Sequence, residues 1–320
     1  MIVIMSSDDD QSTNGVIDWL NFYQKEFIRI NPTDIISEVH FDETLNCHLK
    51  INNRILDLNS VTSYWYRRGN LNLLTGQIKD EAFLFTSEIN KHLKSENLAL
   101  GQFVLKSFER KNALGSYFNT DVNKFEVLQK AQGIGLDIPK TIVTSSKKEL
   151  LSFIEKYQSI ITKCNSEVIF KTKENISLIS YTKRIGLNEI DTLTETFSSS
   201  LFQREVKKRY ELRIFFIDST FYPMAIFSQL DSQTEVDFRV YNESKPNRTI
   251  PFNLPGEIEG KLYRLMIECG YNTGSIDMIV TDEDRYVFLE VNPVGQFDMV
   301  SFPCNYHLQK KIADKLCLQT

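Results

Sequence analysis

Residues 274–297 read GSIDMIVTDEDRYVFLEVNPVGQF, two apolar runs separated by a polar turn. The first run contains Asp277, and the second contains Glu290 followed two positions later by Asn292. Residues two apart in a strand point to the same face, so Glu290 and Asn292 are expected to converge. Asp277 lies 13 residues before Glu290, a separation that suits antiparallel neighbours whose acidic side chains face one another. The stretch therefore predicts a β-hairpin that gathers three side chains with hard-oxygen donors.

Two interpretations of this hairpin are open. Taken alone, its end FLEVNPVGQF (288–297) is an ordinary strand that enters a turn at Asn292 and Pro293. Taken with Asp277, it offers the oxygen ligands that Mg²⁺ prefers. The apolar neighbours of these residues predict an interior setting, where a charge without partners is costly. This setting favours the magnesium site over one Asp in a turn and one Glu on a sheet surface.

The composition predicts an ordinary globular protein. The chain has 320 residues, of which 42% are hydrophobic and 25% are charged, and its formal net charge is −5. This charge does not support a general nucleic-acid footprint. The five cysteines are scattered without a CxxC pair, as expected for reduced thiols, and the apolar start MIVIM is too short for a signal or membrane segment. We therefore expect a cytoplasmic protein that binds neither nucleic acid nor membrane.

The order of elements predicts a mixed α/β fold in three parts. A strand–helix opening and a long helical stretch indicate a first α/β domain, and a second begins near residue 116. A third part, from about residue 201, is rich in β patterns. The predicted elements are a strand over 1–7, a helix over 16–27, a hairpin turning at Asn52 and Asn53, a helix from about 80 to 114, and a helix from about 121–123 to Gly133 or Gly135.

Two lysines are candidates for binding phosphate. Lys163 ends the apolar strand SIITK, and Lys124 lies at the start of the predicted helix, where the helix dipole also favours anions. Each lysine alone is more often a solvated surface residue. The chain contains neither a Walker A sequence nor GxGxxG, so the standard phosphate loops are excluded.

The segment LFQREVKKRYELRIFF (201–216) adds a further charged group. Glu211 and Arg213 share one strand face, and the planar guanidinium of Arg213 is suited to a transferring phosphoryl group. The alternative is a surface salt bridge beside a solvated basic turn at 207–209. The pair Asp237 and Arg239 repeats the spacing.

Together, the paired lysines, the ELR arginine and the terminal D…E-x-N resemble the ATP-grasp carboxylate ligases. More narrowly, YWYRRGN, NKFEVLQKAQGIGLDIPKT, KKRYELRIFF, DFR and FLEVNPVGQF resemble the graspetide synthetases, which macrocyclise ribosomally made peptides in microviridin and grasp-with-spasm pathways. This resemblance implies an ATP-grasp fold with ATP clamped between its last two domains. The implied domains are a pre-ATP-grasp N-terminal domain (1–115), a small central domain (116–200) and a larger C-terminal domain (201–320).

The resemblance also implies a role for each matching residue. By position, Mg²⁺ is held by Asp277, Glu290 and Asn292, the ATP phosphates by Lys124 and Lys163, and the adenine by a hinge of Gln203, Arg204, Glu205 and Val206. Lys208 and Glu211 are further nucleotide contacts, with Glu211 at the ribose. Arg213 orients the γ-phosphate and the acyl phosphate, and Arg239 lies near the acidic side chain of the substrate. One departure is KCNSEV (163–168), which lacks the glycines of a typical ATP-grasp lid.

The implied activity is ATP-dependent formation of ω-ester or ω-amide links between Asp/Glu and Ser/Thr/Lys side chains of a precursor peptide, through an acyl phosphate. The implied partners are a peptide with a leader and an acidic core, bound by the central domain, and a second copy in a homodimer. One alternative is a ligase that adds a free amino acid to a peptide or protein carboxylate. Another is a nucleotide-binding regulatory module without catalysis. The four histidines are interpreted as ordinary residues, so no general base is assigned.

Overall fold

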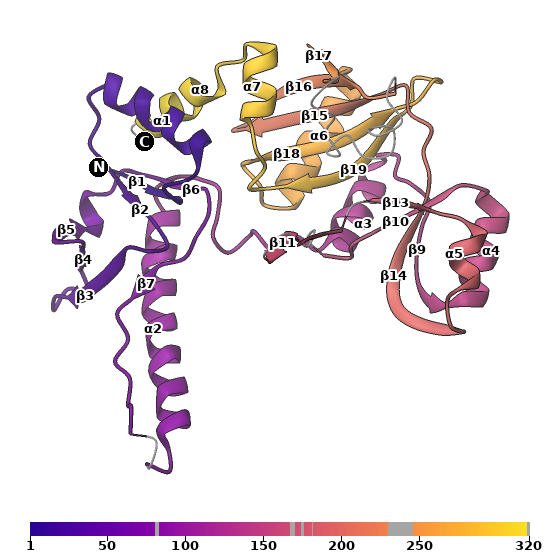
Figure 1. Cartoon of the computed structure of the whole chain (residues 1–320). Helices are drawn as coiled ribbons and strands as arrows, with labels where there is room; N and C mark the ends of the chain where they lie inside the picture. Colours follow the sequence, from indigo (N-terminus) through magenta and orange to yellow (C-terminus); the bar gives the residue numbers. More distant parts are fainter. Residues whose placement is uncertain (81–82, 167–169, 174–175, 181, 230–245, 319–320) are drawn as a thin grey trace. The chain divides into compact units, whose positions relative to one another are not determined.

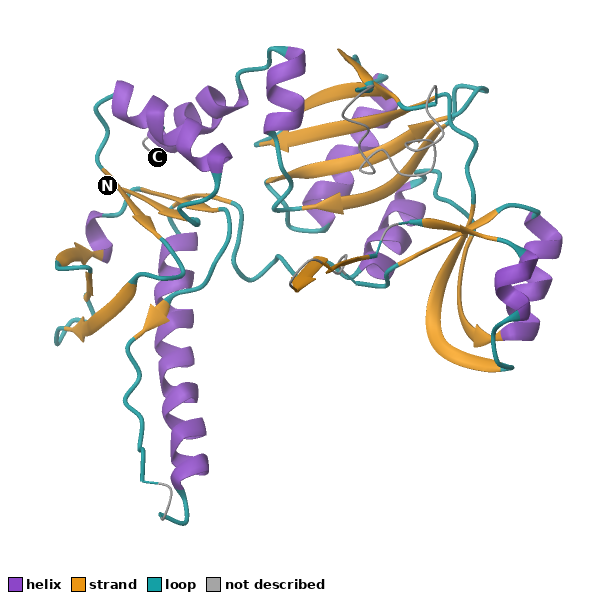
Figure 2. Cartoon of the chain, in the orientation of Figure 1, coloured by secondary structure: helices purple, strands orange, loops and turns teal. Residues whose placement is uncertain are grey.

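A computed structural model of the chain describes residues 1–80, 83–166, 170–173, 176–180, 182–229 and 246–318 (Figure 1). The chain divides into two compact units. The first comprises 1–120, 296–301 and 307–320, and the second comprises 121–295 and 302–306. Each unit combines β-sheets with α-helices (Figure 2), which confirms the mixed α/β class. The predicted division into three domains is a finer one and stays a prediction.

The first unit contains a parallel sheet with the strand order β2-β1-β6-β8. All four residues of β1 are buried, as are all four of β6, because the apolar runs IVIM and SYWY lie at the centre of this sheet. The predicted opening strand is thereby confirmed. The elements are β1 (Ile2–Met5), β2 (Phe27–Ile30), β6 (Ser63–Tyr66), β8 (Asn112–Leu114), α1 (Gln11–Phe22), α2 (Thr86–Glu109) and α8 (Leu308–Cys317).

Helix α1 shows that the predicted helix over 16–27 was wrong at both ends. The side chain of Asp10 accepts a hydrogen bond from the backbone N–H of Thr13 at 3.2 Å, so the helix begins five positions earlier. Gln24 has a φ of 55°, which is incompatible with a continuing helix, and Phe27 begins β2. The apolar residues of α1 do repeat at helical spacing, but the Asp10 cap sets the start of the helix and the turn at Gln24 sets its end.

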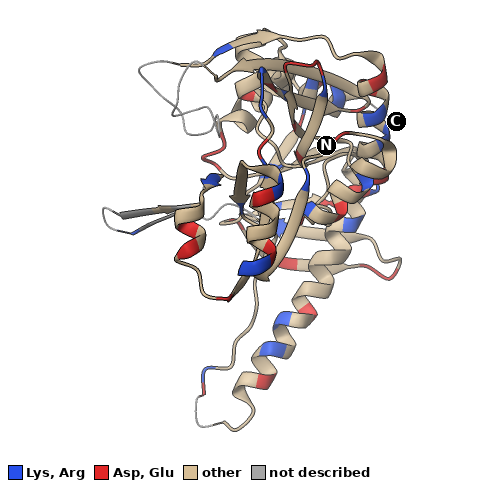
Figure 3. Cartoon of the chain, turned by 90° about the vertical axis from the view of Figure 1, so that its right-hand side faces the viewer, with Lys and Arg blue, Asp and Glu red and all other residues tan. Residues whose placement is uncertain are grey.

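A smaller sheet in the first unit has the order β5-β4-β3-β7. Asn52 and Asn53, with φ of 46° and 66°, join β4 to β5, as predicted for a tight hairpin. Helix α2 ends at Glu109, short of the predicted 114, because β8 follows; both signs of charge lie along it (Figure 3). The elements are β3 (Ile35–Phe41), β4 (Cys47–Ile51), β5 (Arg54–Asp57), the 3₁₀ helix η1 (Leu58–Ser60) and β7 (Asn72–Leu73).

The second unit contains a four-stranded sheet with the order β13-β10-β14-β9. Its helices bury Leu150, Phe153 and Ile190 against Ile160 and Phe202 of the strands. Strands β11 and β12 pair only with each other among the described strands. The elements are β9 (Thr141–Ser146), β10 (Ile160–Lys163), β11 (Phe170–Lys173), β12 (Ile176–Ile179), β13 (Lys183–Ile185), β14 (Thr196–Arg204), α4 (Lys147–Tyr157) and α5 (Leu187–Asp191).

The largest sheet of the second unit is antiparallel, with the order β17-β16-β15-β18-β19. Helices α3 and α6 pack on one of its faces. Helix α3 is capped by Asn123 and ends at Gly135, which has a φ of 86°, so the predicted helix is confirmed. The elements are α3 (Lys124–Ile134), β15 (Tyr210–Ile217), β16 (Thr220–Phe227), β17 (Arg248–Pro251), α6 (Gly256–Glu268), β18 (Thr273–Val280) and β19 (Tyr286–Asn292); α7 (Asp298–Cys304) follows.

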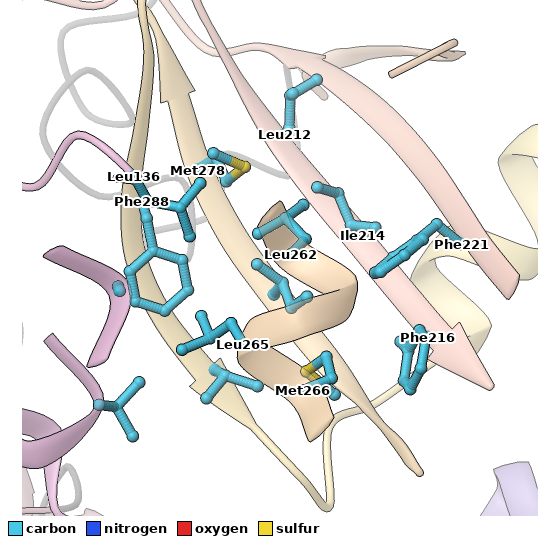
Figure 4. Packing of buried hydrophobic residues seen from close by; sticks show 14 of the residues in the cluster. Leu136, Leu212, Ile214, Phe216, Phe221, Leu262, Leu265, Met266, Met278 and Phe288 are labelled. Carbon is cyan, nitrogen blue, oxygen red and sulfur yellow. The ribbon is translucent and has the colours of Figure 1, made fainter. Parts of the chain in front are cut away.

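Side chains along the central strands alternate between the two faces of the sheet, and only those on the face opposite the core can contribute to a site. Leu212 and Ile214 of β15 and Met278 of β18 point into the core beside α6 (Figure 4). Arg213 lies between Leu212 and Ile214, and Asp277 lies between the core residue Ile276 and Met278. Both charged residues therefore project to the opposite face. The core that fixes the sheet thus leaves a charged row on its other face.

Gly295, in the turn after β19, lies close against β18. A β-carbon at this position would come within 2.8 Å of the backbone nitrogen of Ser275 and closer still to the serine side chain. We expect Gly295→Ala to lower the free energy of unfolding by about 3 kcal/mol, because backbone must move to admit the methyl group. Urea unfolding measures the change.

A matched glycine substitution controls for this effect. Gly133 lies inside α3, and a β-carbon there would meet nothing within 4 Å. Gly133→Ala should stabilise the protein by about 0.5–1 kcal/mol, because alanine favours the helix. Equal effects of the two substitutions would show that the close approach at Gly295 is unimportant.

Among the described residues, no helix is both long enough and apolar enough to cross a bilayer.

Candidate active site

A cleft in the second unit is lined by residues of both its larger sheets. Strands β10 and β14 contribute from one sheet, and β15, β18 and β19 contribute from the other. Seven of the thirteen site residues predicted from the sequence line the cleft: Lys163, Gln203, Arg204, Val206, Glu211, Asp277 and Glu290. Its other lining residues are Pro139, Ile161, Thr182, Leu212, Met278, Ile279 and Leu289.

Asp277 and Glu290 are directly opposite one another on β18 and β19, as the sequence predicted. This pairing depends on a β-bulge. Met278 is paired with Phe288, so a regular ladder would next place Asp277 opposite Leu289. The register shifts at this point, Leu289 becomes the extra residue, and Glu290 takes the place opposite Asp277. The bulge therefore brings both carboxylates to the cleft face of the sheet.

Arg213 lies opposite Asp277 on the other neighbouring strand, β15. Its Nη1 is 2.7 Å from each carboxylate oxygen of Asp277, and both side chains are largely buried, with 12% and 9% exposed. The Nε of Arg213 is also buried and has no hydrogen-bond partner among the described residues. The guanidinium is therefore held by one carboxylate and still has an unused donor.

Lys124 and Lys163 reach the cleft region from different elements. The ammonium of Lys124, at the first position of α3, lies 3.9 Å from Oε2 of Glu290 and donates to the backbone carbonyl of Cys164 at 3.3 Å. Lys163 is the last residue of β10 and lines the cleft directly. The sequence placed both lysines at these ends of elements, and only the fold shows that one of them pairs with Glu290.

Asn292 stands further along β19, opposite Ser275. Its Oδ1 accepts a hydrogen bond from the backbone N–H of Val294 at 2.9 Å and so shapes the turn before Gly295. The predicted turn is therefore observed, and the role of Asn292 as a metal ligand stays a prediction.

Residues 203–206 connect the two sheets that line the cleft. The backbone N–H of Arg204 donates to the backbone carbonyl of Lys140 at 2.8 Å, and the backbone N–H of Glu205 donates to the backbone carbonyl of Ser159 at 3.0 Å. The Glu205 carboxylate accepts from Arg184 Nη2 at 2.7 Å. Val206 and the buried Gln203 line the cleft here. These contacts anchor the segment, and its role as the adenine hinge stays a prediction.

Lys208 and Glu211 form a buried ion pair. The two residues are only 8% and 5% exposed, and the ammonium of Lys208 donates to Oε1 of Glu211. Ser228 donates to the other carboxylate oxygen at 3.2 Å. The alternative of a solvated basic turn at 207–209 is therefore wrong for Lys208, although Lys207 is highly exposed. Periodicity could not reveal this burial, because Lys208 precedes the strand.

Burial raises the pKa of Glu211 from 4.5 to about 7, against the opposing effect of the Lys208 ammonium. The folded state therefore retains a proton that the unfolded chain releases near pH 4.5. This proton stabilises the fold fully below pH 4.5, and the stabilisation is lost as the pH rises through about 7. Glu211→Gln should remove about 3 kcal/mol of pH dependence from the free energy of unfolding.

Urea unfolding between about pH 5 and about pH 8 measures this dependence. Glu259→Gln, at an exposed position of α6, is the matched control and should leave the wild-type profile unchanged. A Glu211→Gln profile with the wild-type slope would contradict the assignment.

Some predictions lie beyond what the structure describes. Arg239 falls outside the described residues, as does part of the segment 163–168 that lacks lid glycines. Among the residues that are described, no group of three or more His, Cys, Asp and Glu side chains could hold a metal ion. The predicted magnesium set, two carboxylates and an amide, has a different composition. All four histidines of the chain belong to the first unit and not to the unit that contains the cleft.

The fold of the chain was compared with the folds of known proteins. No protein-family model and no curated protein matches the chain. The fold nevertheless matches a RiPP-associated ATP-grasp ligase from Chryseobacterium gregarium, solved with ADP and a leader and core peptide, with a TM-score of 0.79 and 26% identity over 99% of this chain and 96% of that one. The chain has the fold of an ATP-grasp ligase.

A second match extends the likeness to a macrocyclase. The chain matches MdnC from Microcystis aeruginosa, solved with the precursor peptide MdnA, with a TM-score of 0.75 and 26% identity over 98% of each chain. The sequence resemblance to graspetide synthetases is confirmed by these matches.

A third match supports the fold. The chain also matches the ATP-grasp ligase PsnB, which was solved with Mg, ADP and a phosphomimetic variant of its minimal precursor. The TM-score is 0.71, and the identity is 15% over 98% of this chain and 97% of PsnB. At that identity the match shows the ATP-grasp fold alone.

Proposed function

We propose that the ligase is an ATP-dependent peptide macrocyclase. It joins Asp or Glu side chains of a ribosomally made precursor to Ser, Thr or Lys side chains through ω-ester or ω-amide links. The observation that carries this proposal is the cleft in which Asp277 and Glu290 face one another beside Arg213 and Lys124. Near-complete structural coverage by a peptide-bound RiPP ligase and by a macrocyclase supports the choice of substrate.

The donors of the cleft fit a magnesium nucleotide. Asp277 and Glu290 offer carboxylate oxygens on one sheet face, with Asn292 as a third ligand, and Mg²⁺ favours such a partial set because it shares phosphate oxygens. When bound, Mg²⁺ would neutralise the charge that develops on the transferring phosphoryl group. Lys124 and Lys163 would hold the phosphates.

The remaining nucleotide contacts lie on the connection between the two sheets. The segment of Gln203, Arg204, Glu205 and Val206 would pack against the adenine as a hinge. The buried pair of Lys208 and Glu211 would bind at the nucleotide, with Glu211 at the ribose. These roles are those that the resemblance to ATP-grasp ligases implies, and they are supported by the presence of Gln203, Arg204, Val206 and Glu211 in the lining of the cleft.

The residues of the cleft can support two successive steps. A carboxylate oxygen of the peptide attacks the γ-phosphorus of ATP, the bond to the β-phosphate oxygen breaks, and ADP leaves with that electron pair. A hydroxyl or amine then attacks the acyl carbon and loses its proton, and phosphate leaves. Arg213 would stabilise the charge in both steps through its planar donors. Arg239 would bind the acidic side chain of the substrate.

Mass spectrometry tests this function. The ligase, Mg²⁺, ATP and an acidic precursor peptide encoded beside its gene should yield a product lighter by one water for each link. A gain in mass equal to an added amino acid would instead identify a ligase for free amino acids. ATP binding without phosphate release, with every candidate peptide, would identify a regulatory module.

The assembly and location of the ligase are part of the same proposal. The central region 116–200 would bind the leader peptide, and two copies of the chain would form a homodimer. A cytoplasmic location suits both the supply of ATP and the five free cysteines.

A further inference from the structure

Both carboxylates of the proposed metal site already have a cation beside them. Asp277 is contacted through both oxygens by Arg213, at 2.7 Å each. Glu290 has the ammonium of Lys124 at 3.9 Å. All four side chains are at most 25% exposed, so water screens these pairs poorly. The carboxylate pair is therefore balanced by charges of the chain itself.

This balance opposes the entry of a divalent cation alone. An ion approaching Asp277 and Glu290 would meet two positive side chains at short range in a poorly screened setting. Mg²⁺ also gives up its hydration shell reluctantly.

A triphosphate changes the balance because it offers new acceptors to both cations. Arg213 has a buried Nε without a hydrogen-bond partner among the described residues, which shows that Asp277 does not use all of its donors. Lys124 lies at the N-terminus of α3, where the helix dipole also attracts phosphate. Contacts of Arg213 and Lys124 with phosphate would free carboxylate oxygens for the metal ion.

We propose that Arg213 and Lys124 are internal counter-cations that keep divalent metal ions off Asp277 and Glu290 until nucleotide phosphates engage them. Metal and nucleotide then bind as one coupled event, in which two ion pairs of the chain are exchanged for contacts with phosphate and metal. This inference rests on the proposed function, since it takes Asp277 and Glu290 as the metal ligands. Arg213 has the larger effect, because its contact is shorter and involves both oxygens.

Binding of Mn²⁺, a paramagnetic substitute for Mg²⁺, tests the proposal without any peptide. The electron paramagnetic resonance signal of free Mn²⁺ reports binding to the full chain with and without the non-hydrolysable analogue AMPPNP, once the Mn²⁺ that AMPPNP binds by itself has been subtracted with a protein-free titration. In the wild-type ligase we expect AMPPNP to tighten Mn²⁺ binding at least about 10-fold. In Arg213→Met we expect tighter Mn²⁺ binding without nucleotide, by about 10-fold, and a smaller gain from AMPPNP.

Two further variants make the result specific. Lys124→Met should shift nucleotide-free Mn²⁺ binding in the same direction by a smaller factor, and it provides a second measurement if Arg213→Met folds poorly. Arg209→Met is the matched control, because Arg209 pairs with Asp284 at the other end of the same strands. It should leave Mn²⁺ binding unchanged.

The outcomes separate this inference from the proposed function. If Glu290→Gln weakens Mn²⁺ binding but neither Arg213→Met nor Lys124→Met tightens it without nucleotide, the counter-cation proposal is overturned and the metal site stands. If Glu290→Gln has no effect on Mn²⁺ binding with AMPPNP present, the metal site itself is refuted. Wild-type binding that is equally tight with and without AMPPNP also overturns the coupling.

Discussion

Glu290→Gln is expected to reduce macrocyclisation by about 10³-fold or more while the protein remains folded. The amide has nearly the shape of the carboxylate but carries no charge, so it cannot serve as an anionic ligand to a metal ion. Glu290 is partly exposed to the cleft and lies outside the hydrophobic core, which predicts a small effect on stability. Product formation by mass spectrometry and thermal unfolding measure the two effects.

A matched substitution in the same hairpin controls for this change. Glu283 lies in the exposed turn between β18 and β19, away from the residues that line the cleft. Glu283→Gln should retain wild-type turnover. Near-normal activity in Glu290→Gln would refute the assignment of Glu290 as a metal ligand, whatever the control shows.

Arg213→Ala is expected to lower the turnover number by about 10²–10³-fold and to change the KM for ATP far less. The guanidinium would contact the γ-phosphate and the acyl phosphate most strongly when charge spreads during transfer, so its loss affects the transition state more than the bound nucleotide. Initial rates of ADP release under multiple turnover, measured over a range of ATP concentrations, give the two parameters separately.

Two further variants test whether the effect is specific to the guanidinium of Arg213. Arg213→Lys should restore only part of the rate, because an ammonium lacks the planar pair of donors. Arg209→Ala removes an exposed arginine at the start of the same strand region and should leave both parameters unchanged. A rise in the KM for ATP with an intact turnover number would assign Arg213 to nucleotide binding alone.

The sequence predicted the hairpin of the site because its signals are local. The spacing of Asp277 and Glu290, the DEDR turn and the flanking apolar runs specify two adjacent strands, and the structure confirms that the two carboxylates are partners. The start of α3 was predictable for the same reason, since Asn123 is a helix-capping residue next to Lys124. Features that depend on neighbours in sequence were therefore predictable.

The contacts between distant segments were not predictable in this way. Lys124 and Glu290 are far apart in sequence, and nothing local indicates that α3 carries one to the other. The local sequence left a solvated basic turn open as an alternative for Lys208, yet the packing around β15 buries this residue against Glu211. The ends of α1 also differed, because a cap and a residue with positive φ outweighed its periodicity.

The bulge in β19 has an effect on solvation as well as on pairing. Leu289 and Glu290 both line the cleft, although consecutive residues of a regular strand would face opposite ways. An apolar side chain is thereby placed next to the carboxylate, where it displaces water and strengthens the attraction of Glu290 for a cation. Deleting Leu289 would leave Glu290 opposite Asp277 in a regular ladder. The two carboxylates of the proposed metal site would then be retained without this apolar neighbour, and the contribution of each to metal affinity could be measured separately.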